Sequence, residues 1–588
     1  MTYRALVALA TVTLSACGGA TATGIEPAAR RPAPAVVDNA SKPGAPMAEP
    51  ATFHSLGVRW AVRGDANSDA VIGVRYRRHG ETTWREALPL FRTDPESVSA
   101  DNRVPGGWLF AGSIVDLAPD TAYEVTLALI DPDGGSVERT LHMKTGAEPR
   151  EPAGMRVQHV VPAGAADRGP GSGTATDPFR GLWIAQATAM PGDLFLLHAG
   201  VYGEGTWTID RHGTPERPII YRGAGDGEAI LDGGGRERLV SANGVKHVWL
   251  ERLTLRRAQY LFVGHSGSHF VVRRCRLEVV EAGITAINGG YAESRGFVIT
   301  DNVFQGLTTW PRTRGIEAAQ GVSITGAGHV VAYNRMSNLG DGVHGTGHGR
   351  LSASDFYNND IEASTDDGIE ADYSDTNVRV FRNRITNAFS GISAQPAHGG
   401  PLYVFRNAIY NVGYSPFKLH NDTSGVLIFH NTSMVNGIPW HIEPGGETVN
   451  DVVTRNNLFV GTRGPALRST GAMIRCDFDR DGYGGPAIPA PCSGPSTSLR
   501  NGMDGSFPLP KRRGAPARST VGTAPCWSTP AATSRVGSAR PGTAAPGFPA
   551  RRPTCASTRP PGRWTPASCC PTSTTGSRAR PPISAVAS

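Results

Sequence analysis

The sequence predicts an all-β protein in which a right-handed parallel β-helix, a solenoid, follows an N-terminal β-sandwich domain. Three features of the 588 residues predict this fold class: an Asn that recurs at a nearly constant step, a short alternating run at the same point of each repeat, and an earlier segment of alternating strands separated by turn signals. A repeat of this length is typical of a solenoid. Connections between parallel strands are almost always right-handed, which sets the hand of the coil.

One Asn marks each repeat. From Asn334 to Asn456 the steps are 25, 24, 24, 24 and 25 residues, and the marked positions are Asn302, Asn334, Asn359, Asn383, Asn407, Asn431 and Asn456. A coil of about 24 residues accommodates three short strands and three turns, and successive coils lie about 4.8 Å apart. We interpret these Asn residues as structural, because Asn tolerates the left-handed backbone of a tight turn and can hydrogen-bond its neighbours in a stack.

Nine or ten residues after each Asn comes a short alternating run. Period two places one apolar set inside the coil, namely Val343, Ile369, Ile392, Phe417 and Trp440, together with Gly345, Ala371, Ala394, Leu419 and Ile442. The first outer column is then His344, Glu370, Ser393, Lys418 and His441, and the second is Thr346, Asp372, Gln395, His420 and Glu443. The runs therefore predict an outer wall rich in groups that titrate or bind metal.

The chain begins with one basic residue, a short apolar run and small residues, a pattern typical of an export signal that is too short to span a membrane. Leu14-Ser15-Ala16-Cys17 resembles a bacterial lipobox. That resemblance implies cleavage before Cys17, lipidation of its thiol, and a lipid anchor in the bacterial cell envelope or at the cell surface. The alternative is an ordinary signal peptide. Residues 18–50 are rich in Ala, Pro and Gly and are expected to form a disordered tether.

Residues 52–146 alternate as short strands with turns between them. The segment Leu117–Tyr123 resembles the signature of a fibronectin type III domain before its sixth strand. The resemblance implies a β-sandwich in which the Tyr123 ring packs at a corner and its hydroxyl bonds to nearby backbone. Such a domain would be a spacer or, less commonly, a carbohydrate binder, and we favour the spacer.

The β-helix is predicted over residues 158–482. Asp177-Pro178-Phe179 opens an amphipathic stretch through Leu182 and Ala185, and short strands follow it. This order resembles the N-terminal cap and first coils of pectate-lyase-like right-handed β-helix proteins, among them polysaccharide lyases of the chondroitinase B and alginate lyase group. A cap is physically required, because an open strand edge would aggregate. The resemblance implies the fold, and a lyase or epimerase activity is the expectation that accompanies it, since one fold hosts many functions.

Residues 484–588 differ sharply in composition. Pro, Arg, Ser, Thr and Ala dominate, no Asp or Glu follows Asp504, and five of the eight Cys lie there. We interpret this tail as disordered or as the product of a frame shift. Its basic residues account for the formal net charge of +7, so the rest of the chain is net acidic. The sequence carries no nucleic-acid-binding or nucleotide-binding motif, and we expect a monomer with no nucleic-acid partner.

The outer columns suggest a polysaccharide lyase that acts on a uronic-acid-containing polymer by β-elimination. Calcium would neutralise the substrate carboxylate and would be held by carboxylates of Glu370, Asp372, Asp366 and Asp367. The catalytic base would be Lys418 or His420, with His344 and Glu370 beside it. Lys418 would need a lowered pKa, for which a neighbouring His offers positive charge.

Four further residues are candidates for substrate binding, namely Glu317, Gln395, His441 and Glu443. Glu317 is expected one coil before His344, after a loop that contains Trp310. Three alternatives use the same wall. A C5-epimerase needs the same groups, and an inverting glycoside hydrolase could use Glu370 and Asp372, about 7 Å apart on one strand. The third is a glycan-binding or adhesive solenoid without enzymatic activity.

Overall fold

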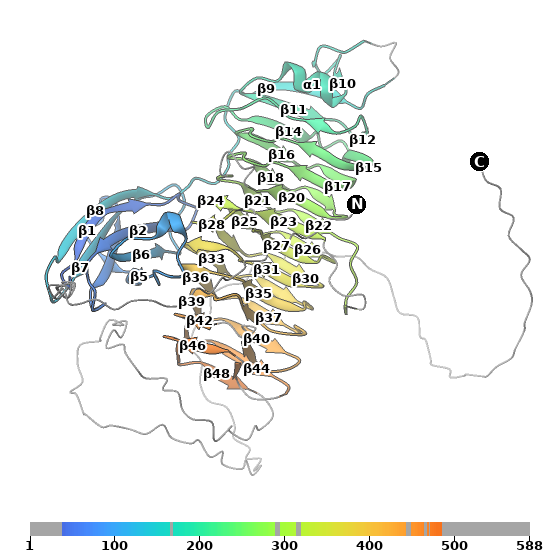
Figure 1. Ribbon diagram of the computed structural model, residues 1–588. Coiled ribbons are helices and arrows are strands. Elements are labelled where there is room, and N and C mark those ends of the chain that lie inside the picture. Colours follow the sequence, from blue (N-terminus) through green and yellow to red (C-terminus); the bar gives the residue numbers. More distant parts are fainter. Residues whose placement is uncertain are drawn as a thin grey trace, which may run out of the picture. The chain divides into compact units, whose positions relative to one another are not determined.

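The computed structural model describes residues 38–484, apart from 165–168, 288–293, 313–318, 348, 443–447, 464–466 and 470. It confirms the predicted fold class: a small antiparallel sandwich precedes a parallel β-solenoid (Figure 1). The predicted signal with Cys17, most of the tether and the tail after 484 lie outside the described residues. In the part of the chain that is described, no helix is long and apolar enough to cross a membrane.

The sandwich consists of two antiparallel four-stranded sheets and one short 3-10 turn (Ala100–Asn102). One sheet has the order β1 (Lys42–Ala48), β2 (Leu56–Arg63), β6 (Gly107–Ile114) and β5 (Phe91–Arg92). The other has the order β4 (Arg85–Glu86), β3 (Val71–Arg78), β7 (Ala122–Ile130) and β8 (Val137–Lys144). The Tyr123 ring is buried, and its hydroxyl accepts a hydrogen bond of 3.0 Å from the backbone N–H of Ala118.

Strand β1 corrects the predicted tether, which had included residues 42–48. The strand shows no alternation, and its pairing with β2 shifts register between Pro43 and Pro46. Proline is tolerated in an edge strand because one side of the strand needs no ladder hydrogen bonds. Backbone pairing therefore orders a segment whose composition alone indicates disorder.

The solenoid has three parallel faces. One face is the 16-stranded sheet, and the other two are parts of the 19-stranded sheet that the long strands β15 (Ala229–Ser241) and β17 (Thr254–Val263) join. The first face contains β9 (Arg156–Val161), β10 (Phe179–Arg180), β11 (Asp193–Leu197), β14 (Ile219–Gly223), β16 (Val248–Glu251), β18 (Val271–Arg273), β21 (Val298–Thr300), β25 (Val330–Ala332), β29 (Asp355–Tyr357), β33 (Val378–Phe381), β36 (His398–Phe405), β39 (Ser424–Phe429), β42 (Thr448–Asn450), β43 (Val453–Arg455), β46 (Ala472–Ile474) and β47 (Asp477–Asp479).

The second face contains β12 (Gly200–Tyr202), β19 (Arg276–Glu278), β22 (Val303–Gln305), β26 (Arg335–Ser337), β30 (Asp360–Glu362), β34 (Arg384–Thr386), β37 (Ala408–Tyr410), β40 (Thr432–Val435), β44 (Leu458–Gly461) and β48 (Gly482–Gly484). The third face contains β13 (Trp207–Thr208), β20 (Ala282–Ala286), β23 (Gln320–Ile324), β27 (Asp341–Gly345), β31 (Asp367–Glu370), β35 (Ser390–Ala394) and β38 (Phe417–Leu419). The long strands β15 and β17 pass from the second face to the third.

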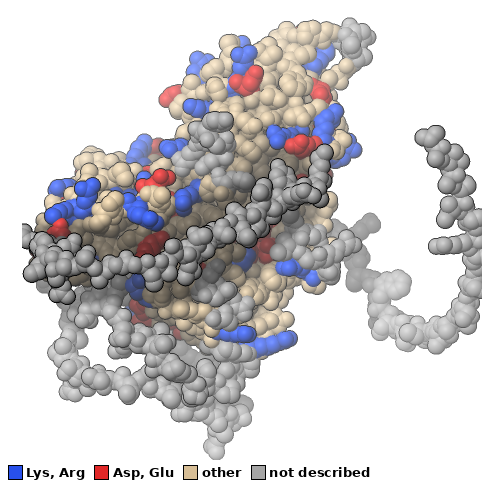
Figure 2. Space-filling view, viewed as in Figure 1, with Lys and Arg blue, Asp and Glu red and all other residues tan. Residues whose placement is uncertain are grey.

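Smaller ladders stack in the turns. They are β24 (Gly326–Ala327), β28 (Leu351–Ser352) and β32 (Ser374–Thr376). A separate pair, β41 (Trp440–Ile442) and β45 (Leu467–Ser469), packs next to β38 of the third face. The predicted cap is present as helix α1 (Leu182–Thr188), which buries Leu182 and Ala185 against the first coils. In the view of Figure 2, acidic and basic side chains of the described residues are interspersed over the surface.

The Asn ladder lies inside the turns. Oδ1 of Asn383, for example, accepts hydrogen bonds from the backbone N–H and from Nδ2 of Asn359, both at 3.0 Å. The prediction that each Asn itself adopts the left-handed turn is wrong, because the residue just before it does so, as at Asn358 and Arg382. For the same reason the ladder ends at Asn457 and not at Asn456, whose φ is 58°.

The sandwich is not a free spacer, since it covers part of the first face. Phe53 and Phe91 of the sandwich pack in one buried cluster with the stacked rings of Tyr357, Phe381 and Phe405. Polar side chains at this contact are also paired, as Glu49 accepts hydrogen bonds from Thr376 and Asn377. These contacts correct the prediction that the domain is only a spacer between the tether and the solenoid.

A buried neutral histidine predicts acid sensitivity of the solenoid. His329 is fully buried, its Nδ1 accepts a hydrogen bond from the Phe297 N–H, and its Nε2 lies 3.1 Å from the Thr325 carbonyl oxygen. Burial lowers the pKa of His329 from 6.5 to about 3. Because the folded pKa lies below the unfolded one, this contribution to stability is complete above pH 6.5 and is lost as the pH falls towards 3.

We expect the free energy of unfolding to fall on acidification below pH 6.5, with His329 alone contributing a slope of about 1.4 kcal/mol per pH unit. Denaturant unfolding between neutral pH and mildly acidic pH should therefore show a shallower pH dependence for His329→Gln than for the wild type. The exposed His212→Gln serves as the control. Equal slopes for wild type and His329→Gln would contradict this assignment.

Candidate active site

The strand register on the third face confirms four of the five members of the predicted first outer column. His344 pairs with Glu370, Glu370 with Ser393, and Ser393 with Lys418. The inward partners Val343, Ile369, Ile392 and Phe417 are buried in the solenoid core. The column therefore brings side chains from four successive coils onto one wall.

Four carboxyl groups meet on this wall. Asp341, Asp366, Asp367 and Glu370 each place one oxygen so that all four lie within 4.8 Å of one another. His344 joins them, because its Nδ1 contacts a Glu370 carboxyl oxygen and lies 3.6 Å from Oδ2 of Asp341. The backbone N–H of Asp367 donates to Oδ1 of Asp341 at 3.0 Å, which ties the two coils together. We call Asp341, Asp366, Asp367 and Glu370 the acidic cluster.

Lys418 reaches the acidic cluster from two coils away. Its Nζ donates to Oδ2 of Asp367 at 2.8 Å, and this ion pair is largely shielded from water. Ser393 lies between the two coils and is fully buried. Because its side chain is short, the long Lys418 chain can pass it. The strands that carry Lys418 and Asp367 are about 10 Å apart by strand spacing, and the extended lysine side chain spans this distance.

Three carboxyl groups of the cluster, those of Asp341, Asp366 and Glu370, resist ionisation. Burial raises the pKa of Glu370 to about 9, and the charge of Asp367 adds to the shift. Burial likewise raises the pKa of Asp341 well above its ordinary value, and the pKa of Asp366 is raised by burial and by the Asp367 charge. These shifts indicate more negative charge than Lys418 can balance.

The pKa of Lys418 differs from the expectation. Burial opposes its positive charge, but the charge of Asp367 and the hydrogen bond to it outweigh burial and raise the pKa of Lys418 above its ordinary value. The predicted lowering of the Lys418 pKa by a neighbouring His is therefore wrong for the protein alone, because the charges of Asp367, Asp366 and Asp372 raise it. Burial lowers the pKa of His344, so its ring is a neutral hydrogen-bonding partner for Glu370.

The donor set of the cluster fits a hard divalent cation. All four groups offer carboxylate oxygens, which is the chemistry that Ca²⁺ prefers. The Oδ1 atom of Asp367 is buried and receives no hydrogen bond from a donor among the described residues. A cation there would supply the charge and the contact that this oxygen lacks. The predicted ligands Asp366, Asp367 and Glu370 thus lie together, and Asp341 joins them.

Asp372 does not belong to this cluster, although it was a predicted ligand. Its Oδ1 accepts hydrogen bonds from Oγ of Ser393 at 2.7 Å and from the N–H of Gln395 at 2.8 Å. Asp372 therefore fastens two coils, and its buried carboxyl has a pKa well above its ordinary value because of burial. The predicted pairing of Glu370 with Asp372 for an inverting hydrolase loses its basis, since one of the two carboxyls is committed to structure.

None of the other predicted residues that the structure describes belongs to the acidic cluster. His420 follows β38 at the edge of the third face, and Gln395 follows β35 with a buried Oε1 that has no partner among the described residues. His441 lies on β41, two coils beyond Ser393. Glu317 and Glu443 fall outside the described residues, so the structure does not test them.

An aromatic column flanks the acidic cluster. Phe389 and Tyr414 stack with ring centroids 5.3 Å apart and planes 5° apart, and His441 meets Tyr414 edge-on at 5.3 Å. Arg312 covers the other face of Phe389 at 4.3 Å from its centroid. The N–H of Ser390, next to Phe389, donates to the Asp366 carbonyl, which places this column one coil from the cluster.

An open groove of about 410 Å³ leads to the other side of the cluster. It follows the wall over β15, β17, β20, β23 and β27 and ends at His344 and Thr346. Arg238, Tyr260 and Glu281 lie along it, and Tyr260 donates a hydrogen bond to Glu281. Groove, cluster and aromatic column therefore follow one another along the solenoid axis.

Two parts of this site were missed by sequence reasoning. Asp341 could have been found, because Asp341-Gly342-Val343 repeats as Asp367-Gly368-Ile369 in the same register. Arg312, Phe389 and Tyr414 lie outside the alternating runs, so no periodicity points to them. Their arrangement follows from how turns of neighbouring coils stack.

Comparisons with known proteins identify similar solved structures only. No family model matches the chain, and no curated protein sequence matches it. A complex of XylC with xylose matches at a TM-score of 0.42 and 11% identity over 56% of this chain and 86% of that chain. An alginate lyase from Paenibacillus sp. str. FPU-7 matches at 0.32 and 13% over 51% and 95%, and pectate lyase Pel9A at 0.31 and 17% over 57% and 83%. At these identities the likeness concerns the fold.

Proposed function

We propose that this protein is a polysaccharide lyase that cleaves a uronic-acid-containing polymer by β-elimination on the third face of its solenoid. The observation that carries the proposal is the ion pair between Lys418 and Asp367 within a cluster of four carboxyls that lacks sufficient positive charge. Elimination needs a group that neutralises the sugar carboxylate and a base that removes the neighbouring proton. The cluster and Lys418 supply these two requirements at one place.

Calcium fits the acidic cluster, and when bound it would neutralise the substrate carboxylate and the charges of the cluster. Asp341, Asp366, Asp367 and Glu370 would hold it, while His344 orients Glu370 through its hydrogen bond. With the cluster neutralised, the pKa of Lys418 would fall, and its amine, once it has released its own proton to solvent, could accept a proton from the sugar. Asp367 keeps the amine in position for that transfer.

A screen of uronic-acid polymers tests the proposal. The full chain is incubated with polygalacturonate, alginate and glycosaminoglycans, with calcium or with a chelator, and ultraviolet absorbance of the unsaturated product is followed. We expect absorbance to rise with at least one polymer and to stop with chelator. New reducing ends without absorbance would indicate a hydrolase. Inversion at C5 of the uronates without cleavage would indicate an epimerase, and binding of the polymer without any reaction would indicate a binding protein. Each of these results would overturn the lyase proposal.

Arg312 is expected to recognise acidic sugars beside the cluster. Its guanidinium lies over Phe389, donates to the Thr365 carbonyl at 3.3 Å, and is close enough to lower the pKa of Asp366 against the larger effect of burial. Arg312→Met keeps the stacking volume and removes the charge. We expect it to raise KM about tenfold with little change in kcat, which corresponds to about 1.4 kcal/mol of uniform binding.

The exposed Arg335→Met on the second face is the matched control for this experiment. Steady-state kinetics on the polymer that the screen identifies give both constants. Unchanged KM in Arg312→Met, or an equal increase in both variants, would show that Arg312 does not contact the substrate.

A further inference from the structure

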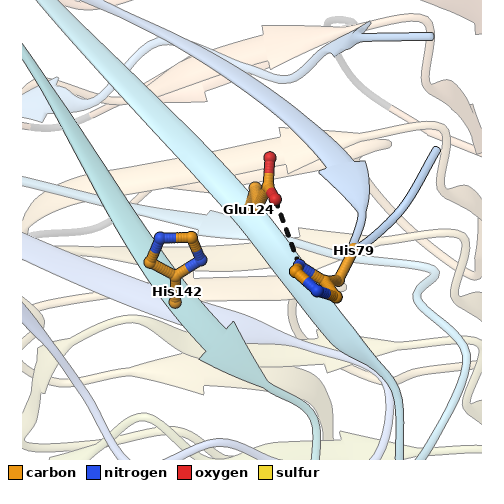
Figure 3. Close-up of side chains that lie close together, drawn as sticks. All are labelled: His79, Glu124 and His142. Atoms are coloured by element: carbon orange, nitrogen blue, oxygen red, sulfur yellow. Dashed lines mark hydrogen bonds and ion pairs between the residues drawn. The ribbon is translucent and has the colours of Figure 1, made fainter. Parts of the chain in front are cut away.

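A second group of three side chains lies on the sandwich, more than 190 residues before the acidic cluster in the sequence. Glu124 on β7 pairs directly with His142 on β8, and His79 follows the end of β3 on the other side of β7. Arg77 also pairs with Glu124, so His79 lies two residues further along on the same face of the sheet. Figure 3 shows the three side chains and the contact between His79 and Glu124.

The donor atoms of these residues are close enough to share one ion. One ligand atom from each of His79, Glu124 and His142 lies within 4.8 Å of the other two. The Nδ1 atom of His79 is 3.1 Å from Oε1 of Glu124. Ligands of a tetrahedral zinc ion at bonds of about 2.0–2.2 Å lie about 3.3 Å apart, so this pair already has the required separation. Only the exposed His142 ring needs to turn inwards.

The carboxylate of this trio is held in place by a second layer. Arg77 donates from Nε to Oε2 of Glu124 at 2.7 Å, which leaves Oε1 towards His79. The Arg77 guanidinium in turn lies 4.5 Å from the centroid of the Trp84 ring. Glu124 is mostly buried beneath these groups, with 13% of its side chain exposed. An oriented ligand carboxylate of this kind is typical of metal sites. The Arg77 charge pairs with Oε2, and Oε1 remains available on the side of His79.

We infer that His79, Glu124 and His142 form a binding site for zinc or a similar divalent first-row metal ion on the outer face of the sandwich. Two imidazoles and one carboxylate are the donor set that such ions prefer, whereas the all-oxygen acidic cluster suits calcium. Three protein ligands leave a position for water or for a donor from another molecule. The inference is independent of the proposed lyase activity.

Zinc titration of the metal-free full chain against a chromophoric chelator tests this site. Every protein in this experiment carries Glu370→Gln, so that zinc bound by the acidic cluster is the same in all samples. The chain with this change alone is the parent. We expect the parent chain to bind one equivalent of zinc more than His142→Ala does, while the exposed His212→Ala binds as the parent does. Arg77→Met should weaken this equivalent about 10- to 100-fold, as loss of a supporting contact does.

Cobalt(II) provides a second readout that folding defects do not imitate. The parent chain should show the visible absorption of a cobalt ion with nitrogen and oxygen ligands, and His142→Ala and His79→Ala should not, although their unfolding temperatures without metal match the parent. Equal zinc stoichiometry and affinity in the parent and His142→Ala would overturn the inference. The same holds if the parent takes up no zinc at this site.

Discussion

Replacing Lys418 by Arg should abolish cleavage of the uronate polymer while the protein remains folded. Arginine keeps the positive charge beside Asp367 but does not give up its proton at accessible pH. The loss of general base catalysis is worth about 10²- to 10⁴-fold in kcat. The measurement is the initial rate of unsaturated product formation, together with the unfolding temperature of each variant.

Lys246→Arg, a change of the same kind at an exposed lysine, is the control and should retain full activity. Asp367→Asn should also be inactive, because it removes both the ion pair with Lys418 and one oxygen of the acidic cluster. If Lys418→Arg retains more than a tenth of wild-type kcat, Lys418 is not the base.

The second large effect concerns stability. Asp355→Ala should lower the free energy of unfolding by about 3–5 kcal/mol, because it leaves the charge of Arg379 buried without its partner. Both side chains are fully buried where the sandwich covers the first face, and Asp355 also accepts hydrogen bonds from Thr52 at 2.6 Å and Ser55 at 2.9 Å. Denaturant unfolding of the full chain measures the change.

The solenoid contains its own control for this experiment. Asp360 and Arg384 form an ion pair of the same residue types with the same separation of 24 residues, but both side chains are exposed. Asp360→Ala should cost less than about 1 kcal/mol, as surface pairs do. Similar losses for Asp355→Ala and Asp360→Ala would show that the sandwich does not seal this contact in solution.

Sequence periodicity predicted the solenoid and the facing of the third face well, because burial on one side fixes the register of a strand. It placed the ladder one residue early at Asn456, where two adjacent Asn residues offer the same spacing. It gave no indication that Asp355 and Arg379 form a buried ion pair. Their burial depends on the sandwich, whose packing against the first face has no periodic signature.

The candidate site was predictable in part for similar reasons. The column of His344, Glu370 and Lys418 follows from period two. The contact of Lys418 with Asp367 does not, since it depends on the length and path of one flexible side chain across Ser393. Asp372 was predicted to bind the metal because it shares a strand face with Glu370. Its carboxyl instead accepts two hydrogen bonds from the next coil, from Ser393 and Gln395, and so has a structural role.

The most direct measurement of the central claim is the mass of the oligosaccharides released from the cleaved polymer in water with heavy oxygen. Elimination across the acidic cluster and Lys418 predicts unsaturated fragments that take up no heavy oxygen from the solvent at the cut. Fragments that carry one heavy oxygen at the new end would mean that water attacks the bond, and would contradict the account.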